Sequence, residues 1–118
     1  MGYYTDFNLT ITDRQGEYVT KYDDKYAAVY NRLADRFEEA IGISDALDRL
    51  TTGQYPNWKW YDYEKDMRSI AKDFPDFIFT LEGDGEETGD LWVEQYCGDE
   101  WARSVAQLIP PDSNPLGL

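Results

Sequence analysis

The chain has 118 residues, of which 42% are apolar and 16% aromatic, so a packed single domain is expected rather than a disordered chain. Its 24 acidic residues outnumber 11 basic ones and give a formal net charge of −13. A field of that sign repels phosphate backbones and anionic lipid. We therefore expect no direct binding to nucleic acid or membrane, and a basic protein surface or a metal ion as partner.

The first half of the chain predicts one strand and two helices. Alternating apolar and polar residues indicate a strand over residues 4–12. Apolar residues at three- and four-residue spacing predict a helix that begins at Asp23 or Asp24 and that Gly42 ends. Its expected inward stripe comprises Tyr22, Tyr26, Val29, Tyr30, Leu33, Phe37 and Ile41. A short second helix follows, with Ser44 as its N-cap.

The second half predicts a crossover and a hairpin. The expected elements are a strand over 58–61, a helix between Asp62 and Pro75, and strands over 77–81, 91–97 and 101–108. The helix should turn one face inward, formed by Met67, Ile70, Ala71 and Phe74 at i, i+3, i+4 and i+7. The strand–helix–strand unit would be a right-handed crossover if its two strands are parallel neighbours. A glycine-rich acidic loop over 82–90 precedes the last two strands.

Together these elements predict an α+β fold. We expect a mixed, mainly antiparallel sheet of about five strands, with two main helices and one short helix on one face. A single α+β domain should span residues 1–109, followed by a frayed C-terminal tail over 110–118.

The residue types that the chain lacks exclude several chemistries. It has no histidine, which removes the commonest general base and the commonest metal ligand. Cys97 is the single cysteine, so no internal disulfide can form, and its acidic neighbours disfavour a reactive thiolate. No signal peptide and no apolar run of about 18 residues is visible, so we expect a cytoplasmic protein.

A distinctive pattern runs from Trp60 to Trp92. Its residues are Trp60, Tyr61, Asp62, Glu64, Asp66, Met67, Phe74, Pro75, Asp76, Phe79, Leu81, Gly83, Gly85, Glu86, Glu87, Gly89, Asp90 and Trp92. In order and spacing it resembles a family of small uncharacterised bacteriophage and prophage proteins. The resemblance implies a phage accessory protein that acts in the cytoplasm of the bacterial host. It implies no reaction, because none is assigned to the family.

The densest acidic stretch, over residues 82–100, is the first candidate site. Carboxylates that surround large aromatic side chains are typical of a surface that binds a basic protein, because Tyr and Trp dominate interface hot spots. The hypothesis assigns partner binding to Glu82, Asp84, Glu86, Glu87, Asp90, Trp92, Tyr96 and Trp101. The alternative is a hairpin loop whose carboxylates are merely solvated.

A cation site is a second hypothesis for the same region. If the crossover strands are parallel, Asp62 and Glu82 lie at their carboxyl ends, where open α/β sheets bind ligands. Clustered oxygens suit Ca²⁺ or Mg²⁺, although no EF-hand spacing is present. The candidate ligands are Asp62, Glu82, Asp84 and Glu86. A simple helix-capping role for Asp62 is the alternative.

Tyrosines recur at four-residue spacing in Tyr18, Tyr22, Tyr26 and Tyr30. They predict either a core helix face or an exposed patch that anchors a partner or a homodimer. The leading functional hypothesis is a small acidic phage accessory protein that binds and modulates a host or phage protein, without catalysis or cofactor. One alternative is a DNA mimic that blocks a nucleic-acid-binding host defence protein. Another is a divalent-cation-binding module or metal-dependent enzyme.

Overall fold

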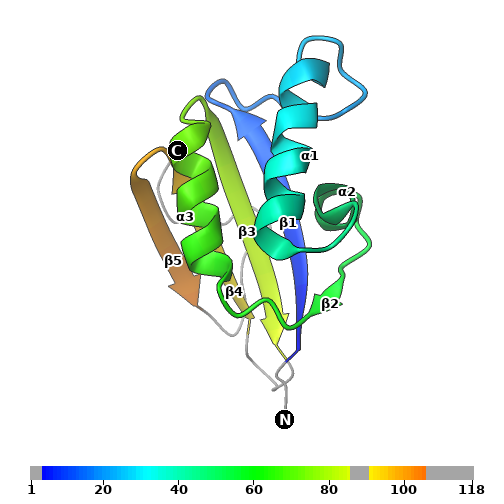
Figure 1. The fold of residues 1–118 in the computed structure, drawn as a ribbon. Helices are drawn as coiled ribbons and strands as arrows, with labels where there is room; N and C mark the ends of the chain where they lie inside the picture. The colour runs from blue at the N-terminus through cyan, green and yellow to red at the C-terminus, as the bar shows by residue number, and fades with distance from the viewer. Residues whose placement is uncertain (1–3, 86–90, 106–118) are drawn as a thin grey trace.

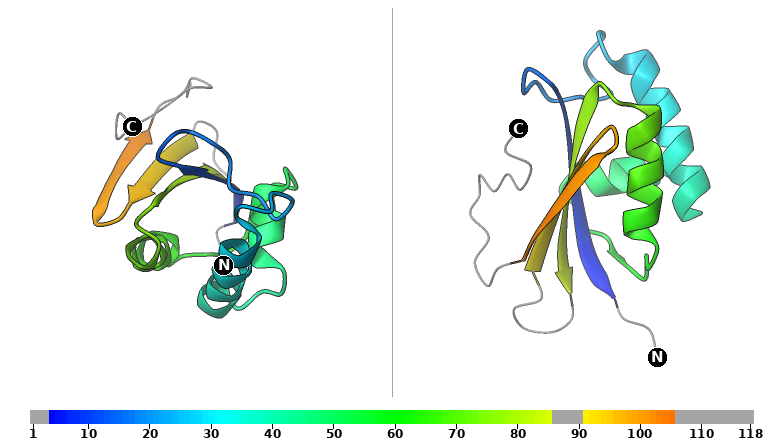
Figure 2. Two further views of the ribbon diagram at one scale, coloured as in Figure 1. Left: turned by 90° about the horizontal axis from the view of Figure 1, so that it is seen from above. Right: turned by 90° about the vertical axis from the view of Figure 1, so that its left-hand side faces the viewer.

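The computed structural model describes residues 4–85 and 91–105, which form an α+β fold (Figure 1). Its elements are β1 Thr5–Asp13, α1 Ala27–Ile41, α2 Ala46–Thr51, β2 Asn57–Trp58, α3 Tyr63–Asp73, β3 Phe77–Gly85, β4 Leu91–Cys97 and β5 Glu100–Val105. The five strands form one sheet in the order β2-β1-β3-β4-β5. All three helices cover the same face of this sheet (Figure 2).

The sheet is antiparallel throughout, which corrects the expected mixed sheet. Strands β2 and β3 do run in the same direction, but β1 lies between them and pairs with both. The predicted crossover between parallel neighbours is therefore wrong. The nine residues of β1 pair with β3 along its whole length, whereas β2 contributes two residues only. Cross-strand pairs stabilise a sheet, and β1 forms nine of them with β3 but only two with β2.

The core lies between the helices and the covered face of the sheet. On β1, Phe7, Leu9 and Ile11 are buried and alternate with half-buried polar residues, as predicted. They pack with buried residues of the helices, among them Leu33, Phe37, Leu47, Leu50, Met67 and Ile70. The inward face predicted for α3 is thus confirmed.

The boundaries of α1 and α2 differ from the prediction. Helix α1 begins at Ala27 rather than at Asp23 or Asp24. The Asp23 carboxylate accepts a hydrogen bond from the Lys25 amide at 3.0 Å, and the Asp23 carbonyl accepts one from the Tyr26 amide at 2.9 Å. Residues 23–26 therefore form a turn. Gly42 ends α1 with φ 78°, as expected. In α2 the N-cap is Asp45, not Ser44.

Strand β3 extends four residues beyond the predicted range, to Gly85, so half of the predicted acidic loop is strand. Strand β2 covers Asn57–Trp58 instead of 58–61, and β5 begins at Glu100. The rest of the predicted loop, over 86–90, and the predicted tail lie outside the described residues. Within the described ranges no helix has the length and apolar character needed to cross a membrane.

Candidate functional site

The acidic residues predicted to face a partner lie on the sheet face without helices. In β3, Glu82 and Asp84 are exposed and alternate with buried Leu81 and Gly83, which face the helices. The other acidic residues of the prediction, Glu86, Glu87 and Asp90, lie outside the described residues.

The aromatic residues predicted to face a partner belong instead to the core side of the sheet. Trp92 and Tyr96 are buried, and they pair in register with Gly83 and Phe79 of β3. Trp101 is half-buried and stacks on Tyr96 with a centroid distance of 6.1 Å. Strand alternation separates these rings from the carboxylates of Glu82 and Asp84, so the predicted composite surface does not form from them.

The predicted cation ligands do not converge either. Asp62 precedes α3 on the helix side of the sheet, whereas Glu82 and Asp84 point away from the helices. Among residues 4–85 and 91–105, no three Asp, Glu or Cys side chains are grouped closely enough to hold a metal ion. Glu86 lies outside those ranges. Asp62 occupies the N-cap position of α3 but makes no side-chain capping bond.

A buried polar cluster surrounds Glu94 and was not predicted from the sequence. This carboxylate is 0% exposed; it accepts the hydroxyl of Tyr96 and a guanidinium bond from Arg103 (Nη1···Oε2 3.1 Å). The same Arg103 nitrogen donates to the Tyr63 hydroxyl at 3.0 Å, and the guanidinium lies over the Trp92 ring at 5.1 Å. The cluster thereby ties β5 to α3. Its signal was the opposite charge of Glu94 and Arg103, which only the register of β4 and β5 could place side by side.

Burial dominates the electrostatics of this cluster. It raises the pKa of Glu94 above the ordinary value for a glutamate, although the Tyr96 hydroxyl and the Arg103 charge act in the opposite direction. Burial and the neighbouring Glu94 carboxylate also raise the pKa of Tyr96. No buried side-chain nitrogen or oxygen of the described residues lacks a hydrogen-bond partner, which is typical of a cluster that supports the fold.

The tyrosine ladder is divided by the true start of α1. Its second half is buried: the Tyr26 hydroxyl donates to Asp13, and the Tyr30 hydroxyl donates to Asp48 at 2.7 Å. These bonds lower the pKa of both carboxyl groups, and burial raises the pKa of Tyr30 to about 12. The first half of the ladder, Tyr18 and Tyr22, is exposed, as its second interpretation expected. A role in anchoring a partner stays a prediction.

The exposed rings lie in the segments that flank β1 and β2. Within the described residues, five large apolar side chains are exposed, and all are tyrosines: Tyr4, Tyr18, Tyr22, Tyr55 and Tyr61. They lie directly before β1, in the segment after β1 and on either side of β2. The segments that hold the first four adjoin β1 or β2, and the segment that holds Tyr61 leads from β2 to α3 (Figure 1). We call this region the tyrosine-bordered edge.

A hollow of about 480 Å³ opens at the β2 end of the tyrosine-bordered edge. Its aromatic walls include Trp58, Trp60 and Tyr61, and its carboxylates are Asp62 and Asp66. Trp60 is fixed by the bond from its indole Nε1 to Asp66 Oδ2 (2.8 Å). Aromatic faces attract cations, and the lining already holds one: Lys59 Nζ lies over the Tyr4 ring at 4.8 Å from its centroid.

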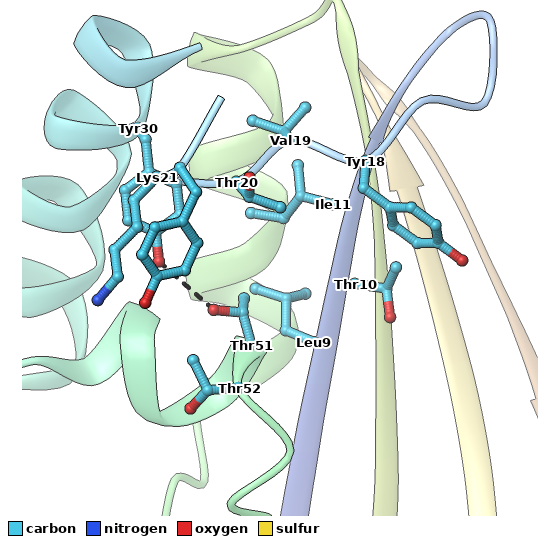
Figure 3. Close-up of a pocket in the computed structure, with 11 residues that line it drawn as sticks. Leu9, Thr10, Ile11, Tyr18, Val19, Thr20, Lys21, Tyr30, Thr51 and Thr52 are labelled. Carbon is cyan, nitrogen blue, oxygen red and sulfur yellow. Dashed lines mark hydrogen bonds between the residues drawn. The ribbon is translucent and has the colours of Figure 1, made fainter. Parts of the chain in front are cut away.

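A recess of about 210 Å³ lies farther along the same edge, between β1, the segment 18–22 and the end of α2 (Figure 3). The edge therefore combines exposed rings with two concave features. No protein-family model, no curated protein and no solved structure matches this chain. The geometry of the edge is accordingly the basis for a functional proposal.

Proposed function

We propose that this chain is a non-catalytic protein that binds a basic segment of a host or phage protein and modulates it. The observation that carries the proposal is that all five exposed large apolar side chains of the described residues are tyrosines in the segments that flank β1 and β2. Tyrosine supplies large, rigid contact area at low cost in side-chain entropy, with a hydroxyl that tolerates water. Exposed tyrosines that border one edge favour a recognition surface.

Charge supports a basic partner. The formal net charge of −13 attracts cationic surfaces and repels a second copy of the chain, so a different protein is favoured over a homodimer. In the hollow at the β2 end, Asp62 and Asp66 stand beside Trp58 and Tyr61, an arrangement that suits a lysine or arginine side chain. The resemblance of the sequence to phage proteins supports an action in a bacterial cytoplasm.

The proposal can be tested by affinity capture from bacterial lysate with the immobilised full chain, at low and at high salt. Two variants separate the candidate surfaces. The triple variant Tyr18→Ser, Tyr22→Ser, Tyr61→Ser changes the tyrosine-bordered edge, whereas Glu82→Gln, Asp84→Asn changes the acidic residues of β3. We expect the wild type and the β3 variant to recover the same stoichiometric partner, and the tyrosine variant to lose it.

Salt should weaken the capture, because part of the attraction is electrostatic. Loss of the partner in the β3 variant alone would move the binding surface to the helix-free face of the sheet. Recovery of no stoichiometric partner by the wild type at low salt would contradict the proposed function.

A further inference from the structure

The outer edge of β1 is covered at two points but not between them. At one point the Phe7 amide donates to the Pro56 carbonyl (3.0 Å), and at the other the Ile11 carbonyl accepts the Val19 amide (2.9 Å). Main-chain groups of alternate residues in a strand point to the same side, and β1 pairs with β3 without a break. Leu9 therefore points its N–H and C=O to the outer edge. Among the described residues no partner reaches them.

The recess of about 210 Å³ lies next to Leu9 (Figure 3). Leu9 lines the recess, and its two main-chain groups face it. Because Leu9 is only 2% exposed, these groups hardly meet bulk water. Buried main-chain groups in native proteins are almost always hydrogen-bonded. The recess is smaller than the ~300–1,000 Å³ of sites for drug-sized ligands, which favours a small occupant with one acceptor and one donor, such as a peptide unit.

Three polar side chains at the α2 side of the recess are already engaged. The Tyr30 hydroxyl donates to Asp48 at 2.7 Å, and the Thr51 hydroxyl donates to the Leu47 carbonyl at 2.8 Å. Lys21 Nζ is held by Asp48 Oδ2 at 3.0 Å. The Leu9 main chain offers an occupant one donor and one acceptor, beside the hydroxyls of Thr10, Tyr18, Thr20 and Tyr22, which also line the recess.

Charge near the mouth of the recess indicates the kind of segment that would fit. Exposed Glu17 and Asp23 flank the two exposed tyrosines of the lining, Tyr18 and Tyr22. The one lysine in the lining is neutralised by its ion pair with Asp48. An occupant with lysine or arginine side chains would meet complementary charge at the rim.

We infer that the recess receives the main chain of an extended, lysine- or arginine-rich segment of the bound partner. The segment pairs with Leu9 as a short added strand between Pro56 and Val19, a mode in which main-chain bonds supply affinity. The stretch from Phe7 to Ile11 spans roughly 13 Å at ~3.3 Å per residue, which accommodates about three partner residues. The inference rests on the proposed function and adds how the partner is held.

The test uses peptides selected from a random display library on the immobilised full chain and then synthesised with blocked ends. Each peptide is N-methylated at one position at a time, which removes single main-chain donors and keeps the side chains. We expect methylation at one central position to weaken binding about tenfold or more. In the free protein the Leu9 amide should exchange with solvent faster than those of Asn8 and Thr10, and the bound peptide should protect it.

The two proposals fail separately. If peptides lose binding to the Tyr18→Ser, Tyr22→Ser variant but tolerate every N-methylation, and the Leu9 amide stays unprotected, the partner is held by side chains alone. That result overturns main-chain pairing and leaves the function standing. If no selected peptide depends on the two tyrosines and none protects Leu9, both proposals are overturned. Protection of Leu9 together with one sensitive N-methyl position supports the inference.

Discussion

The two sides of the sheet, its β4–β5 edge and its β2–β1 edge, present the same residue types in different environments. At the β4–β5 edge, the Tyr96 hydroxyl and the Glu94 carboxylate are buried and bonded to each other, and Arg103 bonds to Glu94 and to half-buried Tyr63. At the β2–β1 side, tyrosine rings are exposed, with Tyr22 at 83%, and the Leu9 main chain faces a recess. Paired and buried, these groups fix the fold. Exposed, they form a surface that another protein can contact.

The largest effect that would separate the two sides is expected from Glu94→Ala. The change leaves Arg103 and the Tyr96 hydroxyl without their shared acceptor. We expect a loss of about 3 kcal/mol in the free energy of unfolding, the lower end of the ~3–5 kcal/mol for a broken buried pair, because the Arg103 side chain is 38% exposed. Urea denaturation followed by fluorescence measures it. Glu82→Ala is the matched control, with an expected change within about 0.5 kcal/mol.

The next effect concerns the seat of Trp92 in β3. A methyl group added at Gly83 would overlap the buried Trp92 indole, which pairs with Gly83 in register. We expect Gly83→Ala to destabilise the protein by about 2 kcal/mol through overpacking. If the overlap is the cause, Gly83→Ala combined with Trp92→Phe should cost less than the sum of the two single changes. Strict additivity in urea denaturation would refute the overlap.

The pH dependence of stability should have opposite signs on the two sides. The folded state raises the pKa of Glu94 through burial, so the stability from its proton is full at low pH and is lost as pH rises through the raised value. The wild type should therefore lose stability relative to Glu94→Gln as pH rises above about 4.5, the ordinary value for a glutamate. The unfolding midpoint in urea, measured across this range for both proteins, is the readout.

Asp48 provides the contrasting case. The Tyr30 hydroxyl lowers the pKa of Asp48, so its contribution is present above the unfolded value of 3.8 and is lost as pH falls through the lowered value. The wild type should gain stability relative to Asp48→Asn as pH rises through the acidic range. Equal slopes for the Glu94 and Asp48 comparisons would break the distinction between the two sides.

The smallest effect on stability is expected at the tyrosine-bordered edge. Tyr18→Ser with Tyr22→Ser should change the free energy of unfolding by no more than about 0.5 kcal/mol per site, because both rings are exposed. The buried counterpart Tyr30→Phe removes the bond to Asp48 and should cost about 1 kcal/mol. A larger loss from the exposed pair than from Tyr30→Phe would show that these rings support the fold.

Local patterns in the sequence determined most of the elements. Period-two alternation located β1, and the spacing of Met67, Ile70 and Ala71 located the inward face of α3. Gly42 ends α1 because it adopts a positive φ at low steric cost. These features depend on residues close together in the chain, which is why composition, spacing and turn chemistry were enough to find them.

Pairing across the sheet was decided by tertiary structure alone. The insertion of β1 between β2 and β3, and the register that sets Glu94 against Arg103, join residues far apart in sequence. Register also sent Trp92 and Tyr96 to the core and Glu82 to the opposite face, because a strand alternates its side chains whatever their chemistry. The open position at Leu9 has no sequence signal, since it arises from where Pro56 and Val19 stop covering the edge.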